Sequence, residues 1–495
     1  MVVTNQLKNQ HLLWRAGFGP MAEELGQLTN ATQKAYFQAL VKASRKNPVY
    51  LDLADNYIKG LSMGIEEVGR TQRKELTDEE KKKVRQQSRE NIRSLNLAWL
   101  NEMVHSESQL REKMSLFWHG HFASRNLNIL YQQQLLDAIR RNALGNFGTL
   151  LKEVSRSAAM INFLNNNQNR KDHPNENFAR EVMELFTMGR GNYTENDIKE
   201  AARAFTGWGA NVRGEFVFRQ QFHDFGQKTV LGKSGNLDGD AVLDILLQQK
   251  QTARYITTKL YRYFVNEQVD ADKIEWLSGR FYQSNYDLSA LMQDIFTSDW
   301  FFNEKNIGTR IKSPIELIVG IRRMIPMELQ NEDVQLLVQR LLGQVLMYPP
   351  NVAGWPGGKS WIDSSSLMFR LRLPQLLNDA DELNISPKDD DDQMMGMADN
   401  QNKDTAKGGA KNTSRAANRM MRQQIQADIN WDAYTKQFAK TPKEKLVSEI
   451  GKTLLQVPSG VSEKILMQHA TTDNREAFIK TVTIQLMATP EYQLC

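Results

Sequence analysis

Residues 313–325 read SPIELIVGIRRMI, and this stretch indicates the fold class of the whole chain. Ser313 can cap the free N–H groups at a helix start, and the carboxylate of Glu316 can bond back to the Ser313 N–H. Pro314 falls at the first helical position, where its missing N–H costs nothing. Apolar residues then follow at helical spacing, at Leu317, Ile321, Met324 and Ile325. The stretch therefore predicts a capped, amphipathic α-helix.

The same helix-start pattern recurs along the chain, whereas strand patterns are rare. It is present at 77–80 (TDEE), 194–197 (TEND) and 441–444 (TPKE). The best strand candidates are 215–222 (EFVFRQQF) and 228–231 (KTVL), separated by a polar turn that contains glycine. We expect a mainly α protein, a multi-helical orthogonal bundle with a small β-hairpin near 215–232.

One segment differs in composition from the rest. Residues 386–422 contain the run Asp389 to Asp392 and are rich in polar residues, glycine and lysine. Such a segment buries too little apolar surface to offset the entropy of ordering it, so we expect a disordered insertion. The sequence then predicts a main helical domain over 1–385 and C-terminal helices over 423–495 that pack back on it.

Composition excludes several classes of protein. The 63 Lys and Arg residues of the 495-residue chain are interleaved with 58 Asp and Glu, so the net charge of +5 forms no basic stripe typical of nucleic-acid binders. The single cysteine, Cys495, excludes an internal disulfide and a cysteine-based zinc site. No run of about 20 apolar residues is present to span a membrane.

The N-terminal residues bear on the compartment. Residues 1–10, MVVTNQLKNQ, show neither a basic start nor an apolar core of a leader. We therefore expect a cytoplasmic protein as the sequence stands, or a periplasmic or exported one if a leader has been removed.

Four of the seven histidines fall in motif-like segments, which makes these segments candidates for chemistry. The first is FWHGHF at 117–122. His119 and His121 share a face only if the backbone is extended, and Gly120 at the end of an apolar helix permits that. Metal ligation is one interpretation. The other is that one histidine caps the helix end while its neighbour packs in the core.

The second segment, DHPNENFAREVMELFTMG at 172–189, predicts a helix that starts at Pro174 and stops at Gly189. At helical spacing, a polar face forms that contains Asn177, Arg180, Glu181 and Glu184, with His173 and Glu176 near the helix start. Inward carboxylates combined with histidine hold metals in helical proteins. An exposed polar face, or an internal arginine–glutamate network, explains the same residues.

Two further segments place polar groups beside glycine and proline. His223 and Asp224 stand on the expected hairpin turn, and the GQKTVLGKS run after them has one residue too many between its glycines for a phosphate loop, so no nucleotide site is expected. The loop YPPNVAGWPGGKSW at 348–361 is rigid and irregular. In one interpretation Trp355 and Asn351 line a pocket. In the other, the Trp355 indole anchors the loop in the core.

These segments, taken in order with HLLWRAGFGP at 11–20, HDFGQKTVLG at 223–232 and IKSPIELIV at 311–319, carry a resemblance that covers nearly the whole chain. The chain resembles members of the bacterial domain of unknown function 1800 family. The resemblance implies a helical fold and brings no established reaction. It also implies a partner, because members are commonly encoded beside proteins of the domain of unknown function 1501 family, which resemble alkaline phosphatases and sulfatases.

The first functional hypothesis is a metal-dependent hydrolase, in which a divalent ion lowers the pKa of a bound water. The metal would be held by side chains of the first two segments, namely His119, His121, His173, Glu181 and Glu184. The catalytic groups would be a general base, Glu176 or the pair His223 and Asp224, and an anion-binding arginine, Arg180 or Arg15. The substrate pocket would include Asn177, Asn351 and Trp355.

The second hypothesis is a non-catalytic helical scaffold or accessory protein that acts with the phosphatase- or sulfatase-like partner. The polar motif residues, including an ion pair between Arg15 and a buried acid, would then form networks that fix the fold. The two hypotheses differ in one observable: whether the histidine and glutamate side chains converge on an open pocket or are sealed inside with partners of their own.

Overall fold

The computed structural model of the chain describes residues 3–60, 77–379 and 427–495, and it confirms the mainly helical prediction. The predicted capping boxes are present at three helix starts, Thr77, Thr194 and Ser313. The fourth is wrong. Thr441 caps no helix, because the extended backbone of Pro442 is followed by a short 3-10 turn at Lys443–Lys445, and the helix begins only at Leu446.

The helices fall into three groups along the chain. The first group comprises α1 (Asn5–Ala16), α2 (Gln33–Ser44), α4 (Asp78–His105), α5 (Gln109–His121), α6 (Ile129–Asn142), α7 (Phe147–Arg156) and α8 (Ala158–Phe163). The second comprises α9 (Asn177–Glu181), a π-helix (Val182–Met188), α10 (Glu195–Ala204), α11 (Gly239–Leu247), α12 (Lys250–Phe264), α13 (Ala271–Gln283) and α14 (Leu288–Phe296). The third comprises α15 (Pro314–Met324), α16 (Asp333–Leu342), α17 (Ser364–Asp379), α20 (Trp431–Thr435), α21 (Leu446–Leu454), α22 (Glu463–Gln468) and α23 (Arg475–Met487).

The strands within the described residues form three antiparallel pairs: β1 (Trp208–Ala210) with β2 (Phe216–Phe218), β3 (Lys228–Val230) with β4 (Lys233–Gly235), and β5 (Met327–Leu329) with β6 (Ala427–Ile429). The predicted pairing of 215–222 with 228–231 is therefore wrong. After β2 the chain forms a 3-10 turn at Gln220–Phe222, and β2 pairs with the preceding strand, β1. Leu231 and Gly232, with φ of 48° and 76°, then close a tight turn that pairs β3 with β4.

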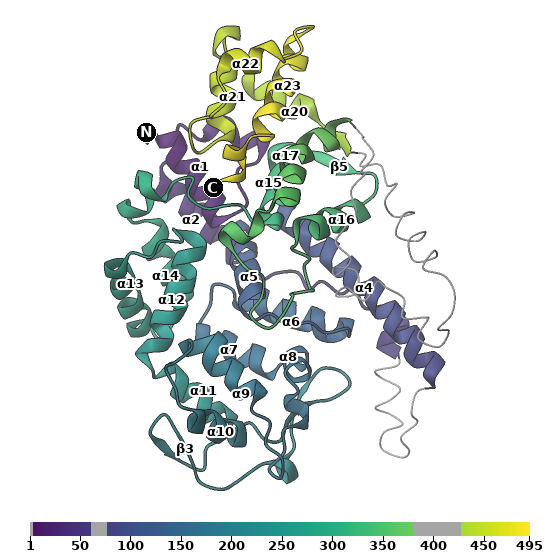
Figure 1. Cartoon of the computed structure of the whole chain (residues 1–495), viewed down its shortest axis with the longest axis vertical. Coiled ribbons are helices and arrows are strands. Elements are labelled where there is room, and N and C mark those ends of the chain that lie inside the picture. Colours follow the sequence, from purple (N-terminus) through teal and green to yellow (C-terminus); the bar gives the residue numbers. More distant parts are fainter. Residues whose placement is uncertain (1–2, 61–76, 380–426) are drawn as a thin grey trace.

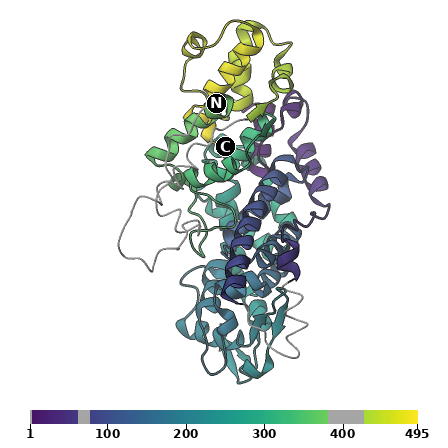
Figure 2. The same cartoon turned by 90° about the vertical axis from the view of Figure 1, so that its right-hand side faces the viewer.

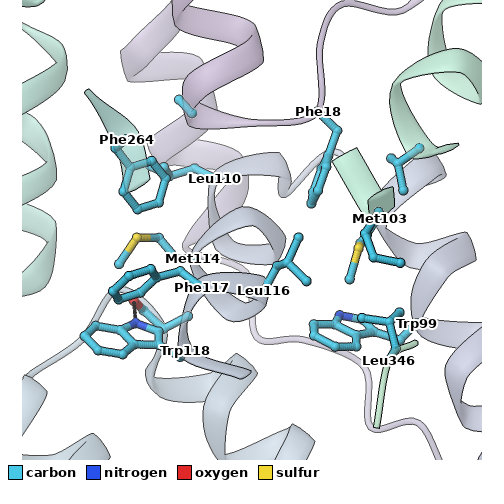
Figure 3. Close-up of a cluster of buried hydrophobic side chains, with 14 of the residues drawn as sticks. Phe18, Trp99, Met103, Leu110, Met114, Leu116, Phe117, Trp118, Phe264 and Leu346 are labelled. Carbon is cyan, nitrogen blue, oxygen red and sulfur yellow. Dashed lines mark hydrogen bonds between the residues drawn. The ribbon is translucent and has the colours of Figure 1, made fainter. Parts of the chain in front are cut away.

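Helix α5 lies at the centre of the molecule and organises the core. Every residue of α5 except Gly120 is buried. Figure 3 shows Leu110, Met114 and Trp118 of this helix packed among side chains from distant parts of the chain. These include Phe18, which follows α1, and Phe264 of α12. Because the charged residues of α5 are buried with the apolar ones, each needs a partner inside the protein.

The two ends of the described chain lie close together. In Figure 1 the molecule is elongated, with α1 beneath the C-terminal helices α20–α23 at the top and α7–α11 at the bottom, and Figure 2 shows the same order from the side. Gln10 of α1 donates hydrogen bonds to the carbonyl oxygens of Lys452 and Thr453 in α21, at 2.7 and 2.9 Å. The first helix and the last helices thus form one packed unit.

Two predictions concern the remaining segments. The disordered insertion predicted at 386–422 lies outside the described residues. None of the helices that are described is both long and apolar enough to cross a membrane.

Candidate functional site

The two histidines of the first motif lie on the last turn of α5 and not in an extended segment. Successive residues of an α-helix are rotated by about 100°, so side chains two apart point in nearly opposite directions. His119 Nε2 accepts the N–H of Met347 at 3.1 Å, whereas His121 Nε2 lies 3.2 Å from the carbonyl oxygen of Phe186. The expectation of a shared face is wrong for this reason, and each ring is held by its own neighbours.

The first and fourth motifs meet at the end of α5. The Trp355 ring lies 5.4 Å from the His119 ring, centroid to centroid. Gly354 has a φ of 81°, and a Cβ at that position would lie 2.2 Å from the Gly120 carbonyl oxygen, so only glycine allows this contact. Trp355 is half-buried against the helix and anchors the loop. Asn351 is exposed and its Oδ1 accepts the Ala353 N–H at 2.9 Å, which leaves it a loop-forming role.

The helix predicted over 172–189 is shorter, and its second part is a π-helix. The α-helical part covers Asn177–Glu181, and Val182–Met188 then winds as a π-helix up to Gly189. A π-helix bonds residue i to i+5, so it rotates each later side chain away from its α-helical position. The single polar face expected from a 3.6-residue period therefore does not form.

The charged residues of this segment pair with their own neighbours. Arg180 donates to both Glu195 oxygens at 3.0 and 2.8 Å and to Glu176 at 3.2 Å. Glu184 accepts the Tyr193 hydroxyl at 2.5 Å and the Arg190 guanidinium at 2.7 Å. Glu176 and Arg180 are thus partners of one another, and their roles as a base and an anion-binding group stay predictions.

The pKa values of Glu181 and Glu184 are shifted in opposite directions. Burial and then the neighbouring Glu184 carboxylate raise the pKa of Glu181. The Tyr193 hydrogen bond, which outweighs burial, lowers the pKa of Glu184. Glu184 therefore stays ionised within its own pair of hydrogen bonds.

His173 and Asn177 lie at the surface before and at the start of α9. The His173 N–H donates to the Arg170 carbonyl oxygen at 2.9 Å, and its side chain is exposed. Asn177 is exposed and its Nδ2 donates to the Leu164 carbonyl oxygen at 3.1 Å. Neither side chain faces His119 or His121, which are buried inside the molecule.

His223 and Asp224 point to different partners. His223 is buried, and its Nδ1 donates to the Thr206 carbonyl oxygen at 2.9 Å. Asp224 accepts from Arg203 Nε at 2.7 Å and from the Gly226 N–H at 2.8 Å. The Arg203 bond, stronger here than burial, lowers the pKa of the Asp224 carboxyl. The two side chains share no bond, so they do not form the predicted general-base pair.

Arg15 is fully buried, but no acid of the second segment pairs with it. Its Nη2 donates to the carbonyl oxygens of Asn306 at 3.0 Å and Cys495 at 2.7 Å. Burial lowers the pKa of Arg15 to about 10. Its hydrogen bonds instead tie α1 to Asn306 and to Cys495.

The five predicted metal ligands are not brought together. His119 and His121 are buried on opposite sides of α5, and His173 is exposed. Among residues 3–60, 77–379 and 427–495, no group of three or more His, Cys, Asp or Glu side chains is arranged to hold a metal ion. A bound divalent ion stays a prediction, without a converged ligand set in these ranges.

A carboxylate that the sequence showed only as a helix cap holds a buried ion cluster. Glu316 accepts the Ser313 N–H at 2.7 Å, as the capping box requires. It also pairs with Lys113 Nζ of α5 at 2.5 Å and with two nitrogens of Arg310 at 2.9 and 2.7 Å. Burial would raise the pKa of Glu316, but Arg310 and Lys113 outweigh it and hold this pKa well below its ordinary range.

A second buried cluster surrounds Glu112, the residue before Lys113 on α5. Its carboxylate accepts Trp99 Nε1 at 2.9 Å and Arg111 Nε at 3.1 Å. Arg140 donates from Nε at 3.0 Å and from Nη2 at 2.9 Å. The two clusters lie on either side of one helix. The sequence signal for these clusters is the pair Glu112 and Lys113 in a helix that has apolar residues on every face.

An open groove lies elsewhere, between α1 and the pair α21–α22. A groove with a volume of about 810 Å³ is present there, within the range of about 300–1,000 Å³ that is typical of ligand pockets. Its apolar lining includes Leu7, Val447, Leu455, Val457, Val461 and Leu466. None of the predicted site residues lines it. Sequence reasoning missed it because its walls come from both ends of the chain and carry no titratable motif.

The buried histidine His119 makes stability depend on pH. Burial lowers its pKa from 6.5 to about 4, so the unfolded chain binds a proton between these values that the folded chain does not. Its contribution is fully present above pH 6.5 and is lost as the pH falls toward 4. We expect the free energy of unfolding to drop by about 2 kcal/mol between pH 7 and pH 5 from this residue alone.

Urea titrations at the two pH values check this expectation. His119→Asn cannot titrate, so its loss between pH 7 and pH 5 should be smaller than that of the wild type by the same amount. His11 and His121, whose pKa values burial also lowers, contribute equally to both proteins. Equal losses in the two proteins would contradict a neutral, buried His119.

Comparisons with known proteins agree with the resemblance seen in the motifs. A family model described as "Protein of unknown function (DUF1800)" matches residues 11–494. No curated protein and no solved structure matches the chain.

Proposed function

The chain belongs to the DUF1800 family of proteins of unknown function, and from this premise we propose that it is a non-catalytic accessory protein that binds a segment of a partner protein. The partner segment would lie in the groove between α1 and α21–α22. The observation that carries the proposal is which partners the side chains of the sequence motifs bind. His119, Glu184 and Asp224 bond to groups of their own chain, whereas the groove is open.

Hydrogen bonds within the chain favour a structural role for the polar residues of the motifs. His119 accepts from Met347, Glu184 from Tyr193, and Asp224 from Arg203. Buried polar networks whose members are satisfied make a fold rigid and unique. No contact among the described residues favours the alternative, a metal-dependent hydrolase.

The groove supplies a surface of the right kind for a partner. Glu449 and Lys452 on its wall pair with one another at 2.7 Å, so apolar side chains dominate what a partner meets. Ile465 and Met467 on α22 are exposed large apolar residues beside it. Apolar anchors on a partner would be desolvated in such a groove, which is where binding energy concentrates. The partner that the family resemblance implies is a phosphatase- or sulfatase-like protein of the domain of unknown function 1501 family.

Blocking the groove tests the proposal. Gly451 lies on its wall in α21, and a Cβ added there would meet no atom within 4 Å. The Cβ of Gly451→Trp therefore meets no neighbour, and its indole occupies the groove wall. In calorimetric titrations with the purified phosphatase-like partner, we expect the wild type to bind and Gly451→Trp to bind roughly 100-fold more weakly, a loss of about 2.7 kcal/mol.

Gly279→Trp is the matched control. Gly279 is also a helical glycine with no atom within 4 Å of an added Cβ, and it lies on α13, away from the groove. Its binding should equal that of the wild type, and neither variant should have a lower Tm. A complex that Gly451→Trp leaves intact would contradict binding in the groove.

Metal content tests the proposal against its alternative. A near-stoichiometric divalent metal in the purified chain, lost in a still-folded His173→Ala, Glu181→Ala double variant, would replace the proposal with the metal-dependent hydrolase. The measurement is elemental analysis of both proteins after reconstitution with divalent ions. We expect no metal that depends on these two side chains, because the structure holds His173 and Glu181 in separate surroundings.

A further inference from the structure

We infer that three arginines around Tyr348 form a binding site for a dianionic phosphate group. Arg89 and Arg93 lie one helical turn apart on α4, and Arg125 lies in the loop between α5 and α6. Tyr348 is the first residue of the loop at 348–361. None of these four residues lines the groove, so the inference does not depend on the proposed function.

The backbone just before Tyr348 is held in place by the core. Met347 has a φ of 70°, a conformation that a non-glycine residue keeps only where its surroundings fix it. Its N–H donates to His119 Nε2 at 3.1 Å, and its carbonyl oxygen accepts Gln132 Nε2 at 3.3 Å. The Tyr348 N–H donates to the Val345 carbonyl oxygen at 3.1 Å. The position of Tyr348 is therefore set by buried groups.

The three guanidinium groups gather around the Tyr348 side chain. The guanidinium carbon of Arg125 lies 5.9 Å from the Tyr348 ring centroid. Arg89 and Arg93 are four residues apart in α4, so they project from the same face of the helix. Burial raises the pKa of the Tyr348 hydroxyl, while the positive charges of the three arginines lower it. The two helix arginines thus lie near the same hydroxyl as Arg125.

The positive charge of this cluster exceeds the negative charge that the described residues bring to it. Arg93 pairs with Asp333 at 3.0 Å. Arg89 and Arg125 form no ion pair or hydrogen bond with any described residue. Both side chains are partly exposed, and none of their terminal nitrogens is a buried atom without a partner, so these nitrogens are open to solvent. Two guanidinium groups that a ligand can reach are left without a counter-ion.

Two unpaired guanidinium charges match a phosphate group. A phosphate monoester carries about −1.5 to −2 charge at pH 7 and has three strong acceptor oxygens. Planar guanidinium groups donate to such oxygens through pairs of parallel hydrogen bonds. The Tyr348 hydroxyl, which bonds to no described residue, adds one more donor. A carboxylate carries a single charge and would leave one arginine uncompensated.

The fluorine signal of Tyr348 measures binding in the full chain labelled with fluorotyrosine, and it is assigned as the signal that Tyr348→Phe removes. The probes are inorganic phosphate and methyl phosphate, each compared with chloride at equal ionic strength. We expect both phosphates to shift this signal to saturation and chloride to give no saturable shift. Dimethyl phosphate, with its single charge, should bind about tenfold more weakly. Tighter binding of methyl phosphate than of inorganic phosphate identifies an ester as the ligand, and the reverse order identifies the free ion.

Two variants identify the arginines. Arg89→Gln and Arg125→Gln each remove one unpaired charge, so each should weaken phosphate binding roughly tenfold. Arg262→Gln is the matched control, because Arg262 is an exposed arginine on α12 and its loss changes the net charge equally. This control should bind phosphate like the wild type.

Three results would overturn the inference. They are a Tyr348 signal that responds to phosphate no more than to chloride, equal affinity of the wild type for methyl and dimethyl phosphate, and unchanged affinity in both Arg89→Gln and Arg125→Gln. If the two variants do not fold, the comparison of the phosphate probes on the wild type decides.

Discussion

Glu316→Gln is expected to lower the free energy of unfolding by about 3–5 kcal/mol, as removal of one partner from a buried ion pair does. Glu316 is the carboxylate that Lys113 and Arg310 both contact, and all three side chains are buried. Without its charge, two cations stay in the interior without the carboxylate that both of them contact. The glutamine amide also points an N–H toward groups that only donate. The measurement is a urea or guanidinium unfolding curve at pH 7.

A surface ion pair provides the control for this experiment. Lys46 and Glu107 lie 3.0 Å apart, but both side chains are more than 70% exposed. Glu107→Gln should therefore change the free energy of unfolding by less than about 1 kcal/mol. A Glu316→Gln protein as stable as the Glu107→Gln protein would show that Lys113 and Arg310 find other compensation, and the proposed role of this cluster would be wrong.

Glu112→Gln is expected to have a comparable effect, again about 3–5 kcal/mol. Its carboxylate binds the indole N–H of Trp99 and the guanidinium groups of Arg111 and Arg140. A neutral amide accepts fewer of these hydrogen bonds and leaves two buried arginines without their shared counter-ion. Thermal and denaturant unfolding of the purified variant at pH 7 measure the loss.

A double-mutant cycle separates the ion pair from general packing. Arg140→Met removes one of the cations, and it should cost less in the Glu112→Gln background than in the wild type. The expected coupling is about 1–3 kcal/mol, within the range for residues that share a network. Additive losses would show that Glu112 and Arg140 act independently, contrary to the contacts that the structure describes.

The features that could be predicted from the sequence are those that local chemistry decides. The capping box at Ser313 needs only the next three residues, and it is present with the Glu316 carboxylate bonded to the Ser313 N–H. The mainly helical class follows from many such signals. The Trp355 loop was also predicted to be rigid, and its tight contact with Gly120 depends on the positive φ of Gly354.

The features that could not be predicted depend on partners far away in sequence. Glu112 and Lys113 look like ordinary surface charges of a helix until α15 and α6 are placed beside them. The polar face of the second motif assumed a 3.6-residue period, which the π-helix Val182–Met188 breaks. A cluster of motif residues in sequence therefore did not become a cluster in space.

The contact of α1 with α21 has a consequence for how the protein matures. Gln10 and Lys452 are 442 residues apart in the chain. The contact between α1 and α21 therefore forms only after residue 452 has left the ribosome. Until then α1 provides one wall of the groove without the wall that α21 and α22 form. A ligand of the groove would therefore bind only chains in which α21 and α22 have folded against α1.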